Sequence, residues 1–382
     1  MMNHPVLDLP GVRRFVESIA GNLRDGRSVI VRLPLNATTG IREAVKGAVA
    51  DDDLLHWTKV NTDDGAPLPT LCQNIFPEAL SDGIPLIEGL YDHEEFQAIV
   101  IELGLSETGH WSDWSKFLAE FSEINHGIND LYRSQFAVFL EGPDFSLLPM
   151  PSKSFRLVEQ RWNDVIDGID TQLYAHRALR ERASLTFLQR QLAASICCQL
   201  SKWDIHLCES LCGLDIEKML NPLEHLKAYA NQLGFEKMTD NASEEEKWAA
   251  GIEAVFDGES QPHSAYLALQ GDEETINQRI WQAEVTVLYP HAEMLRRKIL
   301  EREGRQIPIP FRTKNRETIE KLYDIDIGDL YFYFNQAHVS CRPELSSFLK
   351  DLRNTRNALA HFSTVDPHVI TRRHLEKDPW EG

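Results

Sequence analysis

The chain contains 382 residues, of which 42% are hydrophobic and 26% are charged, and it carries a formal net charge of −20. This length exceeds what one hydrophobic core supports, so we expect two or three domains, and the composition excludes a disordered or fibrous protein. The acidic charge also excludes indiscriminate binding of polyanions.

No stretch of the sequence approaches the run of about 20 apolar residues that a membrane span needs, and the N-terminal residues lack the apolar core of a signal peptide. We therefore expect a cytoplasmic protein with no membrane partner. The six cysteines lack the spacing of a disulfide framework. His206, Cys208 and Cys212 come nearest to a metal cluster. Without a paired CxxC motif, buried thiols are favoured over zinc, and no metal is expected.

The N-terminal part of the chain alternates short apolar strands with helical segments. SVIVRLP (28–34) is a β-branched strand, and a loop after it leads into the helical pattern IREAVKGAV. FQAIVIELG (96–104) and QFAVFLEGP (135–143) are two further candidate strands, and we expect Trp111 and Trp114 in the core beside them. Buried strands separated by helices predict a parallel α/β sheet that is covered on both faces.

The strand, loop and helix at 28–48 resemble the start of an AAA-type or STAND-type P-loop ATPase, and the strand that ends in Glu102 resembles its second, acidic motif. A working phosphate loop needs several glycines, a Lys for the phosphates and a Ser or Thr for Mg²⁺. The segment PLNATTGIR has one glycine, with Ile41 and Arg42 where Lys and Ser/Thr belong. We therefore expect a degenerate P-loop-like domain that binds no nucleotide or binds it without hydrolysis. Neither ATPase activity nor a cofactor is expected.

Helical patterns dominate the rest of the chain. Segments such as RLVEQRWNDVIDGI and HRALRERASLTFLQRQLAASICCQL indicate a helical middle domain, and the acid-rich stretch after it indicates a solvated connector with one short helix. The predicted domains are a degenerate P-loop-like α/β domain at 1–150, a helical domain at 151–237, an acidic connector at 238–275 and a helical bundle at 276–382. The predicted fold class is an α/β domain followed by all-α middle and C-terminal domains, mainly helical overall.

The C-terminal part differs from the rest in charge and contains three helical blocks. Residues 276–382 hold 17 Lys and Arg against 15 Asp and Glu, which leaves −22 for the remainder. Only this part is electrostatically tolerant of RNA. The first block is interrupted at Pro290 and stopped by Gly304, the second covers 315–336, and the third begins with Pro343 in its first turn. A small helical bundle is predicted.

An arginine lies on the apolar stripe of the third helix. At about 100° per residue, Arg356 falls in the same stripe as Leu345, Leu349, Leu352 and Leu359. Burial of an unpaired guanidinium is very costly. Arg356 therefore either lines a site, which could form between two chains, or pairs inside the bundle with an acid such as Glu284, Glu293 or Asp351. Asn357 and His361 share the adjoining face near the helix end.

The segment RNALAH (356–361) resembles the R-x4-H motif of the HEPN superfamily, including the Asn directly after the Arg, and the preceding helices resemble that family over about 276–366. The resemblance implies a homodimer through the C-terminal domain, in which two copies of the motif form a composite, metal-independent ribonuclease site. Arg356 would hold the scissile phosphate, His361 would act as acid or base during attack by the RNA 2′-hydroxyl, and Asn357 would orient the pair. The implied product is a 2′,3′-cyclic phosphate.

Three further groups of residues near the motif have two interpretations each. His291 and Glu293 either help to line the site or are ordinary exposed helix residues. A basic run could track an RNA backbone or form a solvated face, and it consists of Arg296, Arg297, Lys298, Arg302 and Arg305. The aromatic run at 331–334 is expected in the core and the dimer interface before base stacking.

Together these patterns favour an RNA endonuclease effector of a prokaryotic conflict or phage-defence system, regulated by its N-terminal domains. Its expected partners are RNA, a second copy of the chain and proteins of a defence complex. The alternative is a non-catalytic assembly or RNA-binding subunit of a larger defence complex.

Overall fold

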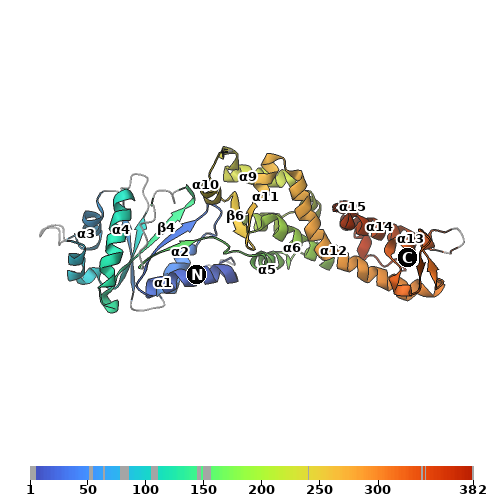
Figure 1. Ribbon diagram of the computed structural model, residues 1–382, viewed down its shortest axis with the longest axis horizontal. Helices are drawn as coiled ribbons and strands as arrows, with labels where there is room; N and C mark the ends of the chain where they lie inside the picture. Colours follow the sequence, from blue (N-terminus) through green and yellow to red (C-terminus); the bar gives the residue numbers. More distant parts are fainter. Residues whose placement is uncertain are drawn as a thin grey trace. The chain divides into compact units, whose positions relative to one another are not determined.

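The computed structural model describes residues 6–50, 55–62, 65–77, 86–104, 111–143, 148, 156–239, 241–336, 339 and 341–380. The chain forms two compact units (Figure 1). The sheet unit consists of Met1–Asp170, Trp203–His206 and Lys237–His263, and the helical unit consists of Thr171–Lys202, Leu207–Glu236 and Ser264–Gly382. Each unit combines separated pieces of chain, so the units do not follow the four consecutive segments expected from the sequence. The expected boundary at 150 lies outside the described residues.

The core of the sheet unit is a parallel sheet of five strands in the order β2-β3-β4-β1-β5. The strands are β1 Ser28–Leu33, β2 His56–Asn61, β3 Ile99–Gly104, β4 Gln135–Glu141 and β5 Leu157–Arg161. In register, Val31 of β1 lies between Phe139 of β4 and Gln160 of β5. Every residue of β1 is buried, as expected for an inner strand with both faces covered. The predicted parallel α/β sheet is confirmed.

Helices α1 Pro10–Arg24, α2 Ile41–Ala50, α3 Pro67–Ile75 and α4 Trp111–His126 belong to the sheet unit. Trp111 and Trp114 of α4 are buried, as the sequence indicated. The stretch expected to be a connector with one short helix contains such a helix, α10 Glu244–Ala249. It also contains a hairpin of β6 Glu253–Phe256 and β7 Glu259–Pro262, which was not expected. Its main-chain turn at Asp257 and Gly258 has positive φ at both residues, as a two-residue hairpin loop requires.

The helical unit makes the chain mainly helical overall, as predicted. Its helices are α5 Gly168–Leu179, α6 Phe187–Ser201, α7 Ile205–Cys212, α8 Ile216–Leu220, α9 Leu223–Leu233, α11 Ser264–Gln270, α12 Glu273–Glu303, α13 Ile327–Phe334, α14 Pro343–Ala360 and α15 Pro367–Thr371. Helices α5 and α7 begin in residues of the sheet unit. The long α12 packs against both α6 and α14, and α13 packs against α14. Among the described residues, no helix is long and apolar enough to cross a membrane.

The three expected C-terminal helices are present with different bounds. Helix α12 continues through Pro290. This proline lies on the exposed side of the helix, so the core loses no packing contact. Helix α14 begins with Pro343 at its first turn, as predicted. The helix expected over 315–336 is wrong in its first half, where the short strands β8 Phe311–Arg312 and β9 Thr318–Ile319 pair. Helix α13 starts only after Asp326, whose side chain caps it by accepting from the N–H of Asp329.

Candidate functional site

The three predicted site residues lie together at the C-terminal end of α14. Arg356 and Asn357 are half-buried, and His361 is exposed. Nη1 of Arg356 lies 3.5 Å from Oδ1 of Asn357. His361 follows the last helical residue, and its backbone N–H donates to the carbonyls of Asn357 and Ala358. The guanidinium and the amide are in contact, and the residue that carries the imidazole lies on the same helix end.

No acid neutralises Arg356 within the part of the chain that the structure describes. The three acids that could have paired with it are engaged elsewhere. Oε2 of Glu284 accepts from the N–H of Val365 at 2.8 Å, Glu293 pairs with Arg296 at 2.8 Å, and Asp351 pairs with Nδ1 of His374 at 2.7 Å. The predicted alternative of an internal salt bridge to one of these acids is therefore wrong, and the guanidinium keeps its donors for another anion.

The turn after α14 is held by two residues of α12, Trp281 and Glu284, for which the sequence did not indicate this role. Nε1 of Trp281 donates to the carbonyl of Leu359 at 2.8 Å, and Glu284 accepts from Val365 as described. The exposed ring of Phe362, a residue with φ of 56°, lies 4.5 Å from the ring of Trp281. These contacts fix the backbone on both sides of His361. The sequence offered Glu284 only as a partner for Arg356, although it is a lone acid on the apolar stripe of α12, between Ile280 and Leu288.

Glu284 is itself an unusual group. Its side chain is fully buried, and Oε1 has no hydrogen-bond partner among the described residues. Burial raises the pKa of Glu284 to about 8, and the hydrogen bond from Val365 only partly offsets this. The carboxyl is therefore mainly neutral at pH 7, and it supports the turn beside His361 as a buried acceptor.

The other candidates near the motif have internal partners. Nε2 of His291 lies 3.1 Å from the carbonyl oxygen of Leu375, so this histidine packs within the unit. Most of the basic run is paired with acids, in the pairs Arg296–Glu293, Arg297–Glu301, Lys298–Asp378 and Arg302–Asp378. These pairs favour the solvated-face interpretation over a track for an RNA backbone.

In the aromatic run, Tyr333 and Phe334 are buried, whereas Tyr331 and Phe332 are half-buried.

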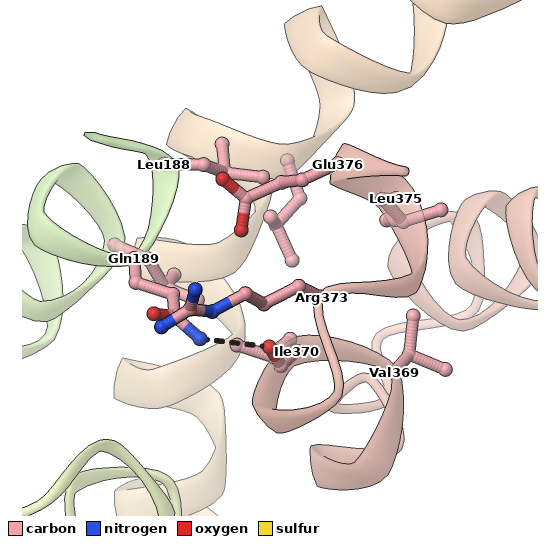
Figure 2. Close-up of a pocket in the computed structure, with 9 residues that line it drawn as sticks. Leu188, Gln189, Val369, Ile370, Arg373, Leu375 and Glu376 are labelled. Atoms are coloured by element: carbon pink, nitrogen blue, oxygen red, sulfur yellow. Dashed lines mark hydrogen bonds between the residues drawn. The ribbon is translucent and has the colours of Figure 1, made fainter. Parts of the chain in front are cut away.

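A small cavity is lined by residues of α6, α12, α15 and the turn after α15 (Figure 2). Figure 2 shows Gln189 of α6 reaching Ile370, and its Nε2 donates to that carbonyl at 3.0 Å. The cavity measures only about 10 Å³, which is about the room that one water needs. It is a packing defect where the C-terminal turns meet α6 and is no place for a substrate.

The cysteines predicted as thiols are free. Cys208 and Cys212 are buried, and Sγ of Cys212 lies 3.7 Å from Sγ of Cys197. Among the described residues, no three His, Cys, Asp or Glu side chains gather in a way that could hold a metal ion.

The loop after β1 lies at the carboxyl ends of the strands, where open parallel sheets usually bind ligands. The cleft beside it measures about 350 Å³. Ile41, at the position of a phosphate-binding lysine, is buried. Arg42, at the position of the metal-binding hydroxyl, reaches back to the acidic strand end, with its Nη1 3.4 Å from Oε1 of Glu102 and its Nη2 3.7 Å from Oε1 of Glu141.

This loop is further occupied by the chain itself. Nε1 of Trp57 donates to the second oxygen of Glu102 at 2.8 Å, so both oxygens of that carboxylate are engaged. The N–H of Leu35 donates to the carbonyl of Ala249, within the sheet unit. A magnesium-bound nucleotide needs a free carboxylate, a metal-binding hydroxyl and free loop N–H groups. The residues present do not fit it.

Comparisons with known proteins assign no family to this chain. No family model matches it, and no curated protein matches it. Among solved structures, the chain is similar to a point mutant of the RuvB protein of Thermotoga maritima, with 10% sequence identity and a TM-score of 0.34 over 68% of this chain and 94% of that chain. A likeness of this size carries no argument about fold or function.

Proposed function

We propose that α12, α13 and α14 form a HEPN-type RNA endonuclease that cleaves without a metal ion and leaves a 2′,3′-cyclic phosphate. The main support for the proposal is that no acid among the described residues pairs with Arg356. This half-buried guanidinium has no acidic partner among the described residues, and it lies one residue from Asn357 and five from the exposed His361. A permanently charged planar donor beside an imidazole is what phosphoryl chemistry on RNA needs.

In the proposed reaction, His361 takes the proton of the ribose 2′-hydroxyl as its oxygen attacks the adjacent phosphorus. The new 2′-oxygen to phosphorus bond forms as the bond to the 5′-oxygen breaks, and the leaving oxygen takes a proton from the imidazolium of a second copy of the motif. Arg356 holds the equatorial oxygens as charge builds on them, and Asn357 keeps the guanidinium in place. Histidine suits the proton transfers because its ordinary pKa is near neutrality.

A second chain completes this site in the proposal. One motif supplies a single exposed imidazole at a helix end, whereas the reaction uses both a base and an acid. A homodimer that brings two α14 ends together supplies both. We further propose that the protein acts as an effector in prokaryotic conflict or phage defence and that its N-terminal part regulates it, since a nuclease would need control.

The competing function is a non-catalytic assembly or RNA-binding subunit of a defence complex. It is favoured by the sheet unit, in which Arg42 pairs with Glu102 and the N–H of Leu35 donates to Ala249, so that the loop after β1 does not fit a nucleotide. In that case Arg356 would contact a partner protein or bound RNA without chemistry.

The product ends test the proposal. Purified full-length protein is incubated with a defined RNA in EDTA, and the fragments are analysed by mass spectrometry. We expect 2′,3′-cyclic phosphate ends and a dimer by light scattering. Fragments with 3′-hydroxyl ends would contradict attack by the 2′-hydroxyl, and a monomer that cleaves at full rate would contradict the composite site.

A further inference from the structure

A cleft of about 430 Å³ is lined by the segment 313–317, by α13 and the residues at its ends, and, from α14, by Arg353. Its lining includes Lys314, Asp329, Tyr331, Phe332, Gln336 and Arg353. Arg353 precedes Arg356 by three residues on α14, and side chains at this spacing are neighbours, about 5–6 Å apart at Cβ. A nucleotide whose phosphate is held by Arg356 therefore has this cleft within reach of its base or of the next one.

The cleft offers aromatic surface beside an arginine. The guanidinium carbon of Arg353 lies 4.9 Å from the centre of the Tyr331 ring, and within the described ranges Arg353 makes no ion pair. Phe332 is half-buried, lines the cleft, and has no aromatic partner in the described part of the chain. Aromatic rings and arginine planes with one open side are what unpaired RNA bases stack on.

The charge of the residues that line the cleft favours a nucleobase over the phosphate backbone of RNA as the group bound there. The lining holds the three acids Glu317, Asp326 and Asp329 but only the two basic residues Lys314 and Arg353, so its net charge repels phosphate. Among the described residues, Asp329 accepts only a long hydrogen bond, 3.4 Å from the N of Lys314 to its Oδ1. Burial, together with the two neighbouring acids, raises the pKa of Asp329. A carboxylate in this situation is stabilised by N–H donors.

Guanine matches this lining best among the RNA bases. Its Watson–Crick edge presents two adjacent donors, N1–H and N2–H, which one carboxylate can accept together, whereas the edge of uracil presents a single donor between two acceptors. The side-chain amide of Gln336 can serve the guanine O6. The ring would stack on Phe332.

We propose that this cleft is a base-binding subsite that selects guanine in single-stranded RNA, an inference that rests on the proposed ribonuclease function. Asp329 reads the base edge, Phe332 stacks on the ring, and Arg353 adds its guanidinium plane beside the Tyr331 ring. All three are specificity-determining or positioning residues, since none touches the reacting atoms.

The test compares the cleavage rates of uridine decamers that contain a single guanosine, a single adenosine or neither. We expect the full-length protein to cut the guanosine RNA about tenfold faster than the all-uridine RNA, the size of one good base contact. Phe332→Ala and Asp329→Asn should reduce this preference to less than about threefold, because stacking and one donor–acceptor match are lost. Tyr289→Ala, which removes an exposed ring of α12 outside the cleft, should keep it.

Binding of 2′-O-methyl versions of the same decamers, measured by fluorescence anisotropy, separates this inference from the nuclease proposal. Cleavage without base preference, or a preference unchanged in both cleft variants, overturns the subsite and leaves the nuclease in place. Guanosine-dependent binding that falls in Phe332→Ala, in a protein that cuts no RNA, supports the subsite and overturns the nuclease. Equal binding of all three decamers by wild type and variants overturns the subsite whatever the cleavage result.

Discussion

Glu284 makes the stability of the helical unit depend on pH. Its pKa rises from an ordinary 4.5 to about 8 on folding, because the carboxyl is buried with one hydrogen bond. Below about pH 4.5 both the folded and the unfolded chain hold the proton. Between 4.5 and about 8 only the unfolded chain releases it, so the free energy of unfolding falls as pH rises. One pKa unit corresponds to about 1.4 kcal/mol. The free energy of unfolding therefore falls by at most about 5 kcal/mol across this pH range.

Glu284→Gln removes this dependence, because glutamine cannot ionise and its carbonyl can still accept from the N–H of Val365. We expect the variant to match wild type within about 1 kcal/mol at pH 5 and to be several kcal/mol more stable at pH 8. Urea unfolding of both proteins at pH 5, 6, 7 and 8, followed by circular dichroism, measures the difference. Glu293→Gln on the same helix is the control, since its surface pair with Arg296 should contribute below about 1 kcal/mol. A difference between wild type and Glu284→Gln that stays constant with pH refutes the reasoning.

Two further predictions concern the contacts around each site. Arg42→Ala leaves the buried Glu102 with Trp57 as its remaining partner. The free energy of unfolding should fall by about 1–3 kcal/mol, which is less than for a fully buried pair because Arg42 is partly exposed. Adding Glu102→Gln should recover part of that loss in thermal melting, and additive losses would contradict a direct pair. Trp281→Phe removes the hydrogen bond to the carbonyl of Leu359 and should cost about 1 kcal/mol. It should also raise amide exchange of the turn after α14, whereas unchanged exchange there would show that the bond does not hold the turn.

The inner strands of the sheet could be predicted from the sequence, and the edge strands could not. Strands β1, β3 and β4 are nearly continuous apolar runs because both their faces are buried. Strand β2 reads HWTKVN and buries only Val60, and β5 reads LVEQR and buries only Leu157. Edge strands with one partner carry polar residues, so their pattern resembles that of a loop or a helix.

The stretch at 238–275 was predicted as a connector because its acids dominate its composition. Its structure depends on a few apolar residues, among them the buried Trp248, Ile252 and Phe256. The dipeptide Asp257-Gly258 between alternating residues is a strong local signal for a hairpin, and it was available in the sequence. Composition averaged over the whole stretch concealed it.

The candidate site was predictable only in its local part. Arg356, Asn357 and His361 lie within one helix end, so their spacing alone places them together. The residues that fix the turn after them, Trp281 and Glu284, are about 75–80 positions earlier in the chain. Such contacts depend on how α12 and α14 pack, which no local pattern specifies.

Cleavage of labelled RNA in EDTA tests the central claim most directly. Wild type is compared with Arg356→Ala and His361→Ala, and with Arg372→Ala and His368→Ala as controls of the same residue types at exposed positions nearby. All five should first have equal oligomeric mass. We predict that the first two variants lose activity at least about 100-fold and that the controls retain it. Equal cleavage by wild type and His361→Ala, or no cleavage by wild type, would contradict the nuclease and favour the assembly subunit.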